Sequence, residues 1–258
     1  MVTCEGYALA VVDEIRCPNC AAPISFSAGE IVATCKYCGF TSVIETGKAF
    51  TFEHSMILNK YNGAQAEELV RNWMRGGFMK PKDLARASKI VEKKLVYLPF
   101  WVVPVSVHSS YEGVFERLSP PVVKKGEIEK KHSWVVLARK AVTFPTREYD
   151  VPLNGKAAYD FRKIEDFAKI LNSEMEEVEA VELARQQIED HQLFLAKQDV
   201  DKIIEIKHEL SGGDAVYLHA PIWFIIYEYK RERYNILLDG ATGAVIKGDI
   251  PTTKFGLF

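Results

Sequence analysis

The sequence predicts an α+β fold in which a small N-terminal metal-binding hairpin precedes a mixed antiparallel-sheet domain with a helical insertion. Three observations lead to this prediction. Four of the five cysteines form two closely spaced pairs near the N-terminus. Segments rich in β-branched and aromatic residues begin near residues 97 and 216, as is typical of strands. Between them, residues 157–198 place apolar side chains at helical spacing.

The composition is that of a folded protein. The chain has 258 residues, of which 48% are hydrophobic and 26% charged, so it is long enough to bury a core. We divide it into an N-terminal metal-binding region (1–50), a basic helical segment (51–96) and an α+β domain (97–258). The formal net charge of −2 excludes a protein that coats nucleic acid through bulk positive charge.

This net charge hides a strong asymmetry along the chain. Residues 60–96 contain nine basic and four acidic side chains, and residues 97–145 contain seven and four. Residues 146–211 instead contain nine basic and sixteen acidic side chains. Any nucleic-acid site is therefore expected to be local, in the basic middle of the chain.

The cysteine spacing is the most specific motif in the sequence. Cys17 and Cys20 form one C-x2-C pair, Cys35 and Cys38 form another, and 14 residues separate the pairs. Four thiolates at about 2.3 Å complete a tetrahedron suited to Zn²⁺, and the softness of sulfur disfavours Mg²⁺ and Ca²⁺. We therefore expect one structural zinc ion, with no coordination position open for water or substrate.

Two alternatives to zinc remain at this stage. A pair of disulfides is disfavoured because the N-terminus has no export signal, and a four-cysteine iron centre is the other possibility. Cys4 lies outside the pattern and is interpreted as a spare thiol. His54 is a conceivable replacement ligand, although four cysteines already suffice.

The hairpin with two cysteine turns resembles the zinc ribbon of the transcription factor IIB type over roughly residues 15–47. Elsewhere the chain is similar to a poorly characterised family of bacterial and archaeal zinc-ribbon proteins. The matching features are Trp73 and the segments 79–84, 97–101, 221–223 and 239–243. Some such proteins are labelled helicase-like, but this sequence has no G-x-x-x-x-G-K-[ST] loop, which excludes a P-loop motor.

Two helices are expected in the basic segment and two in the insertion. Residues 64–75 form the first and residues 81–94 the second, each with one apolar stripe. In the insertion, a stripe runs from Phe161 to Leu171, and Ser173 with Glu176 resembles a capping box that opens another helix.

Strands are expected on both sides of the insertion. The first strand begins at residue 97. A polar loop over 120–131 leads to the second, over 132–144, and the third covers 204–210. Residues 96–101 and 216–223 echo one another, which favours two related strands of one sheet with the helical arm inserted between them; chance recurrence is the alternative. Strands and turns follow to the C-terminus, where Asp239 and Thr242 are interpreted as turn residues rather than metal ligands.

No convergent catalytic set is present, so we do not expect an enzyme. The six histidines form no H-E-x-x-H pair, and no G-x-S-x-G elbow or small-molecule motif occurs. The longest nearly apolar run, residues 215–227, is too short to cross a bilayer. With no signal peptide recognisable, a cytoplasmic location is predicted.

A cluster of basic side chains follows the cysteine pairs and forms a candidate nucleic-acid surface. Trp73 lies among them, where it either stacks on bases or, as the helical stripe favours, packs in the core. The candidate residues are Arg71, Arg75, Lys80, Lys82, Arg86, Lys89, Lys93 and Lys94.

Three functions are therefore ranked. The first is a zinc-binding adaptor or scaffold that docks to a protein or nucleoprotein complex. The second is binding of RNA or single-stranded DNA through residues 71–94. The third, with the least support, is an enzyme of uncharacterised activity.

Overall fold

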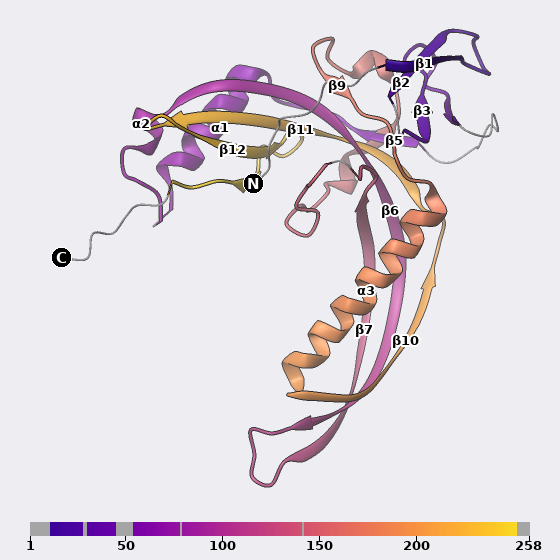
Figure 1. Ribbon diagram of the computed structural model, residues 1–258, viewed down its shortest axis with the longest axis vertical. Coiled ribbons are helices and arrows are strands. Elements are labelled where there is room, and N and C mark those ends of the chain that lie inside the picture. Colours follow the sequence, from indigo (N-terminus) through magenta and orange to yellow (C-terminus); the bar gives the residue numbers. More distant parts are fainter. Residues whose placement is uncertain (1–10, 28–29, 45–53, 78, 141, 252–258) are drawn as a thin grey trace. The chain divides into compact units, whose positions relative to one another are not determined.

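The computed structural model describes residues 11–27, 30–44, 54–77, 79–140 and 142–251 (Figure 1). Its helices and strands, in chain order, are β1 (Val11–Arg16), β2 (Pro23–Ser27), β3 (Val32–Thr34), β4 (Thr41–Val43), β5 (His54–Ile57), α1 (Gly63–Arg75), α2 (Leu84–Ala87), β6 (Lys89–Phe115), β7 (Val122–Leu137), β8 (Lys156–Ala158), β9 (Lys169–Ile170), α3 (Glu177–Asp199), β10 (Lys202–Gly212), β11 (Val216–Tyr229), β12 (Glu232–Asp239) and β13 (Val245–Gly248).

The chain divides into two compact units. The first comprises Met1–Phe100, Leu137–Glu174 and Leu218–Phe258, and the second comprises Trp101–Val136 and Met175–Tyr217. Strands β6 and β11 contribute residues to both. Within the described residues, no helix is both long and apolar enough to cross a membrane.

A nine-stranded sheet contains most of the strands, which confirms an α+β architecture dominated by sheet. Its central order is β10-β6-β11-β12-β13, while β7 and β9 pair with β6, and β5 pairs with β11 and β8. The β6–β9 pair is parallel and the β10–β6 and β11–β12 pairs are antiparallel. The two echoing segments therefore lie in one sheet, as predicted, and in addition β6 and β11 are neighbours in it.

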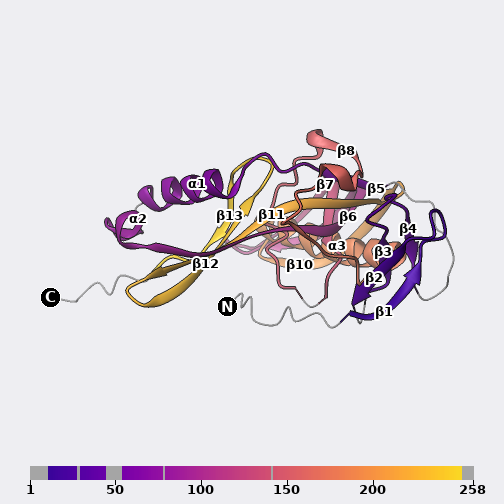
Figure 2. The same cartoon turned by 90° about the horizontal axis from the view of Figure 1, so that it is seen from above.

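In the first unit, α1 lies against the sheet (Figure 2) and contacts β12. Asn62 caps its N-terminus in a capping box with Gln65. Ala66, Val70 and Met74 are buried with residues of β5, β6, β11 and β12 in one core. The predicted first helix is thus confirmed.

The predicted second helix over residues 81–94 is wrong. Only α2 is helical there, and Lys89 already begins β6. From Lys89 to Lys93, exposed and half-buried residues alternate, with Ile90 half-buried between exposed Lys89 and Val91. The segment therefore has the period of a strand. Pairing in the sheet outweighs the local helical spacing.

In the second unit, α3 lies along β7 and β10 (Figure 1). Its buried side chains recur at four-residue intervals and include Ala184, Ile188 and Ala196. Near its C-terminus, Ala196 and Val200 pack on Tyr111, whose hydroxyl donates to Asp199 Oδ2 at 2.6 Å. One amphipathic helix therefore covers this face of the sheet.

The predicted helical insertion starts later than expected. The stripe from Phe161 to Leu171 forms a short 3-10 turn and β9, not a helix. The capping box is also wrong, because Glu176 is the N-cap without a side-chain cap bond, and Ser173 Oγ donates to the Ala138 carbonyl oxygen. Tertiary contacts of this segment replace the local helical pattern.

The predicted boundary of the strand over residues 132–144 is wrong at both ends. β7 begins at Val122 inside the expected polar loop and ends at Leu137. Its mostly exposed first half has few apolar residues, so pairing with β6 rather than burial defines it. The strand predicted over 204–210 lies within β10, and the Asp239 turn is confirmed, since Asp239 accepts hydrogen bonds from Ala241 N–H and the Thr242 hydroxyl.

Candidate metal centre

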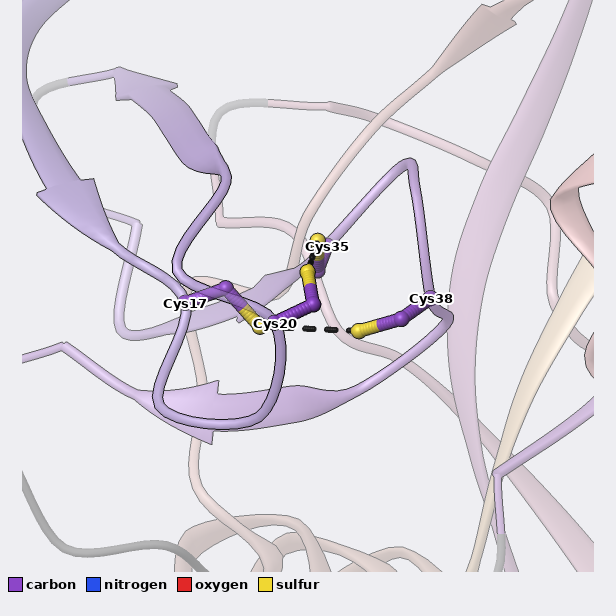
Figure 3. Close-up of side chains that lie close together, drawn as sticks. All are labelled: Cys17, Cys20, Cys35 and Cys38. Atoms are coloured by element: carbon purple, nitrogen blue, oxygen red, sulfur yellow. Dashed lines mark hydrogen bonds between the residues drawn. The ribbon is translucent and has the colours of Figure 1, made fainter.

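The four predicted cysteine ligands converge on one point (Figure 3). Their sulfurs all lie within 4.8 Å of one another, with 3.5 Å between Cys17 Sγ and Cys38 Sγ and 3.7 Å between Cys20 Sγ and Cys35 Sγ. A tetrahedron with metal–sulfur bonds of about 2.3 Å has edges of about 3.8 Å. The sulfur separations therefore fit a four-coordinate metal ion.

Two short β-hairpins carry these cysteines. Strands β1 and β2 form one antiparallel pair and β3 and β4 form the other (Figure 2). We call residues 11–44 the four-cysteine module, of which 28–29 lie outside the described residues. Its small core consists of Cys17, Ile24, Ala33 and Cys35. Cys17 and Cys35 are thus buried, whereas Cys20 and Cys38 are exposed.

Both cysteine pairs lie in turns with the same backbone pattern. Ala21 N–H donates to the Cys17 carbonyl oxygen at 2.8 Å, and Gly39 N–H donates to the Cys35 carbonyl oxygen at 2.9 Å. Ala21 and Gly39, each four residues after the first cysteine of its pair, have positive φ angles of 60° and 76°. Glycine adopts this conformation freely, whereas alanine loses about 1 kcal/mol. The repeated turn directs both sulfurs of each pair to the centre.

Cys38 and Cys20 have different surroundings, which give their thiols different pKa values. Burial alone would raise the pKa of Cys38, but hydrogen bonds from the Phe40 backbone and the Asn19 side chain lower it to about 7. The Ala22 backbone lowers the pKa of Cys20, yet Cys38 and burial raise it to about 12. Cys38 therefore forms a thiolate, the form that binds a metal ion, more readily than Cys20 does.

The module is anchored to the rest of the first unit by a buried ion-pair network. Arg139 Nη1 lies 2.9 Å from Glu30 Oε1, and Arg139 Nη2 lies 2.9 Å from Glu174 Oε1. The side chains of Arg139 and Glu30 are 2% and 3% exposed. Asn172 Nδ2 donates to the second oxygen of Glu30 at 2.9 Å. This network holds the connection between β2 and β3 against the rest of the first unit.

Backbone hydrogen bonds add a second anchor. The backbone N–H groups of Ile31 and Val32 both donate to the Ser173 carbonyl oxygen, at 2.8 and 3.2 Å. Thr34 N–H donates to Asn172 Oδ1 at 3.3 Å. The edge of β3 is thereby joined to the segment that follows β9.

A chain of two histidines forms the third anchor. His219 Nε2 lies 2.9 Å from the Leu171 carbonyl oxygen, which can only accept, so this nitrogen carries the proton. His219 Nδ1 then accepts from His54 Nε2 at 2.9 Å, and His54 Nδ1 accepts from the Thr41 hydroxyl at 2.9 Å. Burial lowers the pKa of His219 to about 4, and burial together with His219 lowers that of His54 well below its usual value. Both rings are neutral near pH 7.

Other predicted site residues lie outside the metal cluster. His54 belongs to the histidine chain and not to the four-sulfur group. Cys4 lies outside the described residues. Trp73 is half-buried and packs against the core of the first unit, with Lys80 Nζ 3.5 Å from its ring centroid. The core interpretation of Trp73 is confirmed.

Apart from Lys80, which lies over the Trp73 ring, the basic candidates divide into two groups. Arg71 and Lys93 both bind Glu67 at 2.9 Å, and Lys94 pairs with Glu92. The second group is exposed and forms no ion pair with a described residue; its members are Arg75, Lys82, Arg86 and Lys89.

Sequence reasoning missed Glu30, Arg139 and His219 as structural site residues. They lie more than 75 positions from one another along the chain, so no local spacing links them. Only His219 has a signal in the sequence: it takes the place that Pro99 has in the echoing segment.

Comparison with protein-family models, with curated proteins and with solved structures gives no match. The resemblance to ribbons of the transcription factor IIB type therefore stays a prediction from the sequence.

Proposed function

We propose that this protein is a non-enzymatic adaptor or scaffold in which a Cys4 zinc ribbon presents a surface to a protein or nucleoprotein complex. The convergence of four sulfurs is the observation that carries the proposal. Zinc is the ion that four thiolates bind most commonly in structural sites. All four ligands come from the protein, so the metal supports a shape rather than a reaction.

The way the module is anchored supports a scaffold. Three sets of contacts, through Arg139, Ser173 and the histidine chain, hold it against the rest of the first unit. Its outer turn leaves Cys38, Lys36 and Tyr37 exposed, and the Tyr37 side chain is 61% exposed. A rigid turn with an exposed aromatic ring is suited to recognition by a partner.

Binding of RNA or single-stranded DNA is the second candidate function. Four exposed cations, Arg75, Lys82, Arg86 and Lys89, support it because they are not neutralised by ion pairs in the described structure. Trp73 and Lys80 do not support it, since they pack on one another. Phosphate contacts alone would give weak, strongly salt-dependent binding.

The adaptor proposal is tested by capture of partners from native cells. Tagged protein is compared with the Cys17→Ser/Cys20→Ser double variant, and with Lys82→Ala/Arg86→Ala as a variant whose module is unchanged. We expect specific proteins that the first pair of substitutions loses and the second retains. Equal capture by all three proteins would contradict a role for the module.

The nucleic-acid candidate is tested by titrating single-stranded DNA and RNA at increasing salt. Binding with a steep salt dependence that disappears in Arg75→Ala/Lys82→Ala/Arg86→Ala/Lys89→Ala would replace the adaptor proposal. Absence of binding at low salt would remove the candidate.

A further inference from the structure

Strand β10 forms an open edge of the sheet in the second unit. Among the described strands it pairs with β6 alone, so it is an end strand of the order β10-β6-β11-β12-β13, at the margin of the second unit (Figure 1). It has 11 residues, whereas β13 at the other end of that order has four. An open edge presents a row of backbone N–H and C=O groups to which another strand can pair.

The regular part of this edge runs from Glu205 to Ser211. The pairing of β10 with β6 shifts register between Ile203 and Glu205, so Ile204 is an extra residue, and the pairing continues without a break to Gly212. A β-bulge bends its strand and disturbs the edge, so the residues after it are the ones suited to further pairing. From residue 205 to residue 211, exposed and half-buried residues alternate.

The two faces of this stretch carry different side chains. Ile206, His208 and Leu210 are half-buried on one face, and Ile206 packs against the cluster of Tyr111, Ala196 and Val200. The residues of the other face are exposed and mostly charged. They are Glu205, Lys207, Glu209 and Ser211. A strand that pairs with β10 therefore has to supply apolar side chains on one face and opposite charges on the other.

The sequence of this stretch is complementary to itself. When two copies of β10 pair antiparallel about a two-fold axis at His208, Lys207 of each copy lies opposite Glu209 of the other. On the other face, Ile206 of each copy lies opposite Leu210 of the other. Opposite-charge pairs and apolar pairs both stabilise antiparallel strands, and the symmetry makes each of them occur twice.

The neighbouring registers are less favourable. An axis at Lys207 places Glu205 opposite Glu209, and like charges directly opposite one another destabilise a strand pair. An axis at Ile206 brings the bulge at Ile204 into the paired stretch. In the single chain, Lys207 Nζ lies 3.0 Å from Glu205 Oε1, with the two side chains 70% and 61% exposed. Such an exposed pair is weak, so it does not prevent Lys207 from pairing across an interface.

Strand β7, the other neighbour of β6 in the second unit, is less suited to pairing. Among the described strands β7 also pairs with β6 alone. Lysines on an edge strand oppose the approach of a second strand, and β7 has four, whereas β10 has one between residues 205 and 211. The exposed lysines of β7 are Lys124, Lys125, Lys130 and Lys131.

We propose that β10 is a self-association surface, through which two copies of this chain form a two-fold symmetric dimer. The two β10 strands run antiparallel with His208 opposite its counterpart, so the sheet continues from one copy into the other. The inference is independent of the adaptor function, because β10 belongs to the second unit and the four-cysteine module to the first. One strand pair buries less than a standard interface of about 1,600 Å², so we expect a dissociation constant in the micromolar range.

The dimer is tested by sedimentation equilibrium of the full-length, metal-loaded protein at micromolar concentrations. Lys207→Glu and Glu209→Lys each replace both opposite-charge pairs with like-charge pairs. We expect each variant alone to associate about tenfold or more weakly than the wild type. The control Glu182→Lys makes the same charge change as Glu209→Lys at an exposed position of α3 and should leave the dissociation constant unchanged.

An equimolar mixture of Lys207→Glu and Glu209→Lys separates lost pairing from lost folding. In a dimer of one copy of each variant, both cross-strand pairs again have opposite charges. We therefore expect the mixture to associate about as tightly as the wild type, although neither variant does so alone. A variant that had lost its fold could not restore association in this way.

The proposal is overturned if the wild type stays monomeric or if the mixture fails to associate. Equal association of the wild type and both variants would assign the dimer to another surface, and growth beyond a dimer would indicate an open, head-to-tail contact. Retained association of Glu209→Lys alone would contradict the axis at His208 and favour one at Ile206. Partner capture with the cysteine variant does not depend on these outcomes, so either proposal can fail without the other.

Discussion

The four-cysteine module and the core of the first unit are stabilised by different means. The module core consists of Cys17, Ile24, Ala33 and Cys35, so two of its four residues are candidate metal ligands. The core beneath α1 in the first unit has fourteen buried residues, none of them cysteine. Burial of apolar surface can account for the stability of the core beneath α1 but not for that of the four-cysteine module. From this difference we expect the module to depend on a bound metal ion and the rest of the chain to fold without one.

Removing the metal should have the largest effect. Cys35→Ser replaces a fully buried ligand, and structural zinc sites contribute about 10 kcal/mol or more to the folding of small domains. We expect loss of the signals of the module in two-dimensional NMR spectra, while those of α1, β11 and β12 persist. Loss of all native signals would show that the two regions are not independent.

Breaking the buried anchor should have the next largest effect. Arg139→Met leaves two carboxylates, Glu30 and Glu174, buried without their cation, and we expect a loss of about 3–5 kcal/mol in unfolding free energy. Arg162→Met, which breaks an exposed pair with Asp160, is the matched control and should cost less than about 1 kcal/mol. Similar losses in denaturant titrations of both variants would contradict the anchoring role.

Acidification should weaken the histidine anchor. The pKa of His219 is about 4 in the folded protein and near 6.5 when unfolded, so the unfolded state binds more protons between these values. The contribution of neutral His219 to the unfolding free energy is therefore fully present above pH 6.5. It decreases by about 3 kcal/mol as the pH falls to 4. The lowered pKa of His54 acts in the same direction.

The pH effect is measured by denaturant unfolding of the wild type and of His219→Gln between pH 7 and pH 4.5, with the metal content followed at each pH. The variant should be less stable at pH 7 and should lose less on acidification. An identical decline in both proteins would assign the pH dependence to other groups.

Substitutions on the basic surface should have the smallest effect. Lys82→Ala, Arg86→Ala and Lys89→Ala each remove an exposed side chain without an ion pair in the described structure. We expect changes within about 0.5 kcal/mol in thermal unfolding. Lys80→Ala should cost more, because its ammonium group lies over the Trp73 ring. Equal effects would mean that the packing of Lys80 contributes nothing.

The same comparison explains what the sequence could predict. The cysteine cluster is encoded by two local spacings, and α1 by its apolar stripe and the Asn62 cap, so both were predictable. The strand from Lys89 and the non-helical run after Phe161 were not, because pairing with distant strands decides them. The Glu30–Arg139 pair joins residues 109 positions apart, and no local pattern indicates it.

Elemental analysis of the protein purified without chelators tests the central claim most directly. We predict about one zinc ion per chain for the wild type, and little or none for Cys35→Ser, with the native signals outside the module retained. Iron in place of zinc, or a wild-type protein that contains no metal and still keeps the fold of residues 11–44, would contradict it.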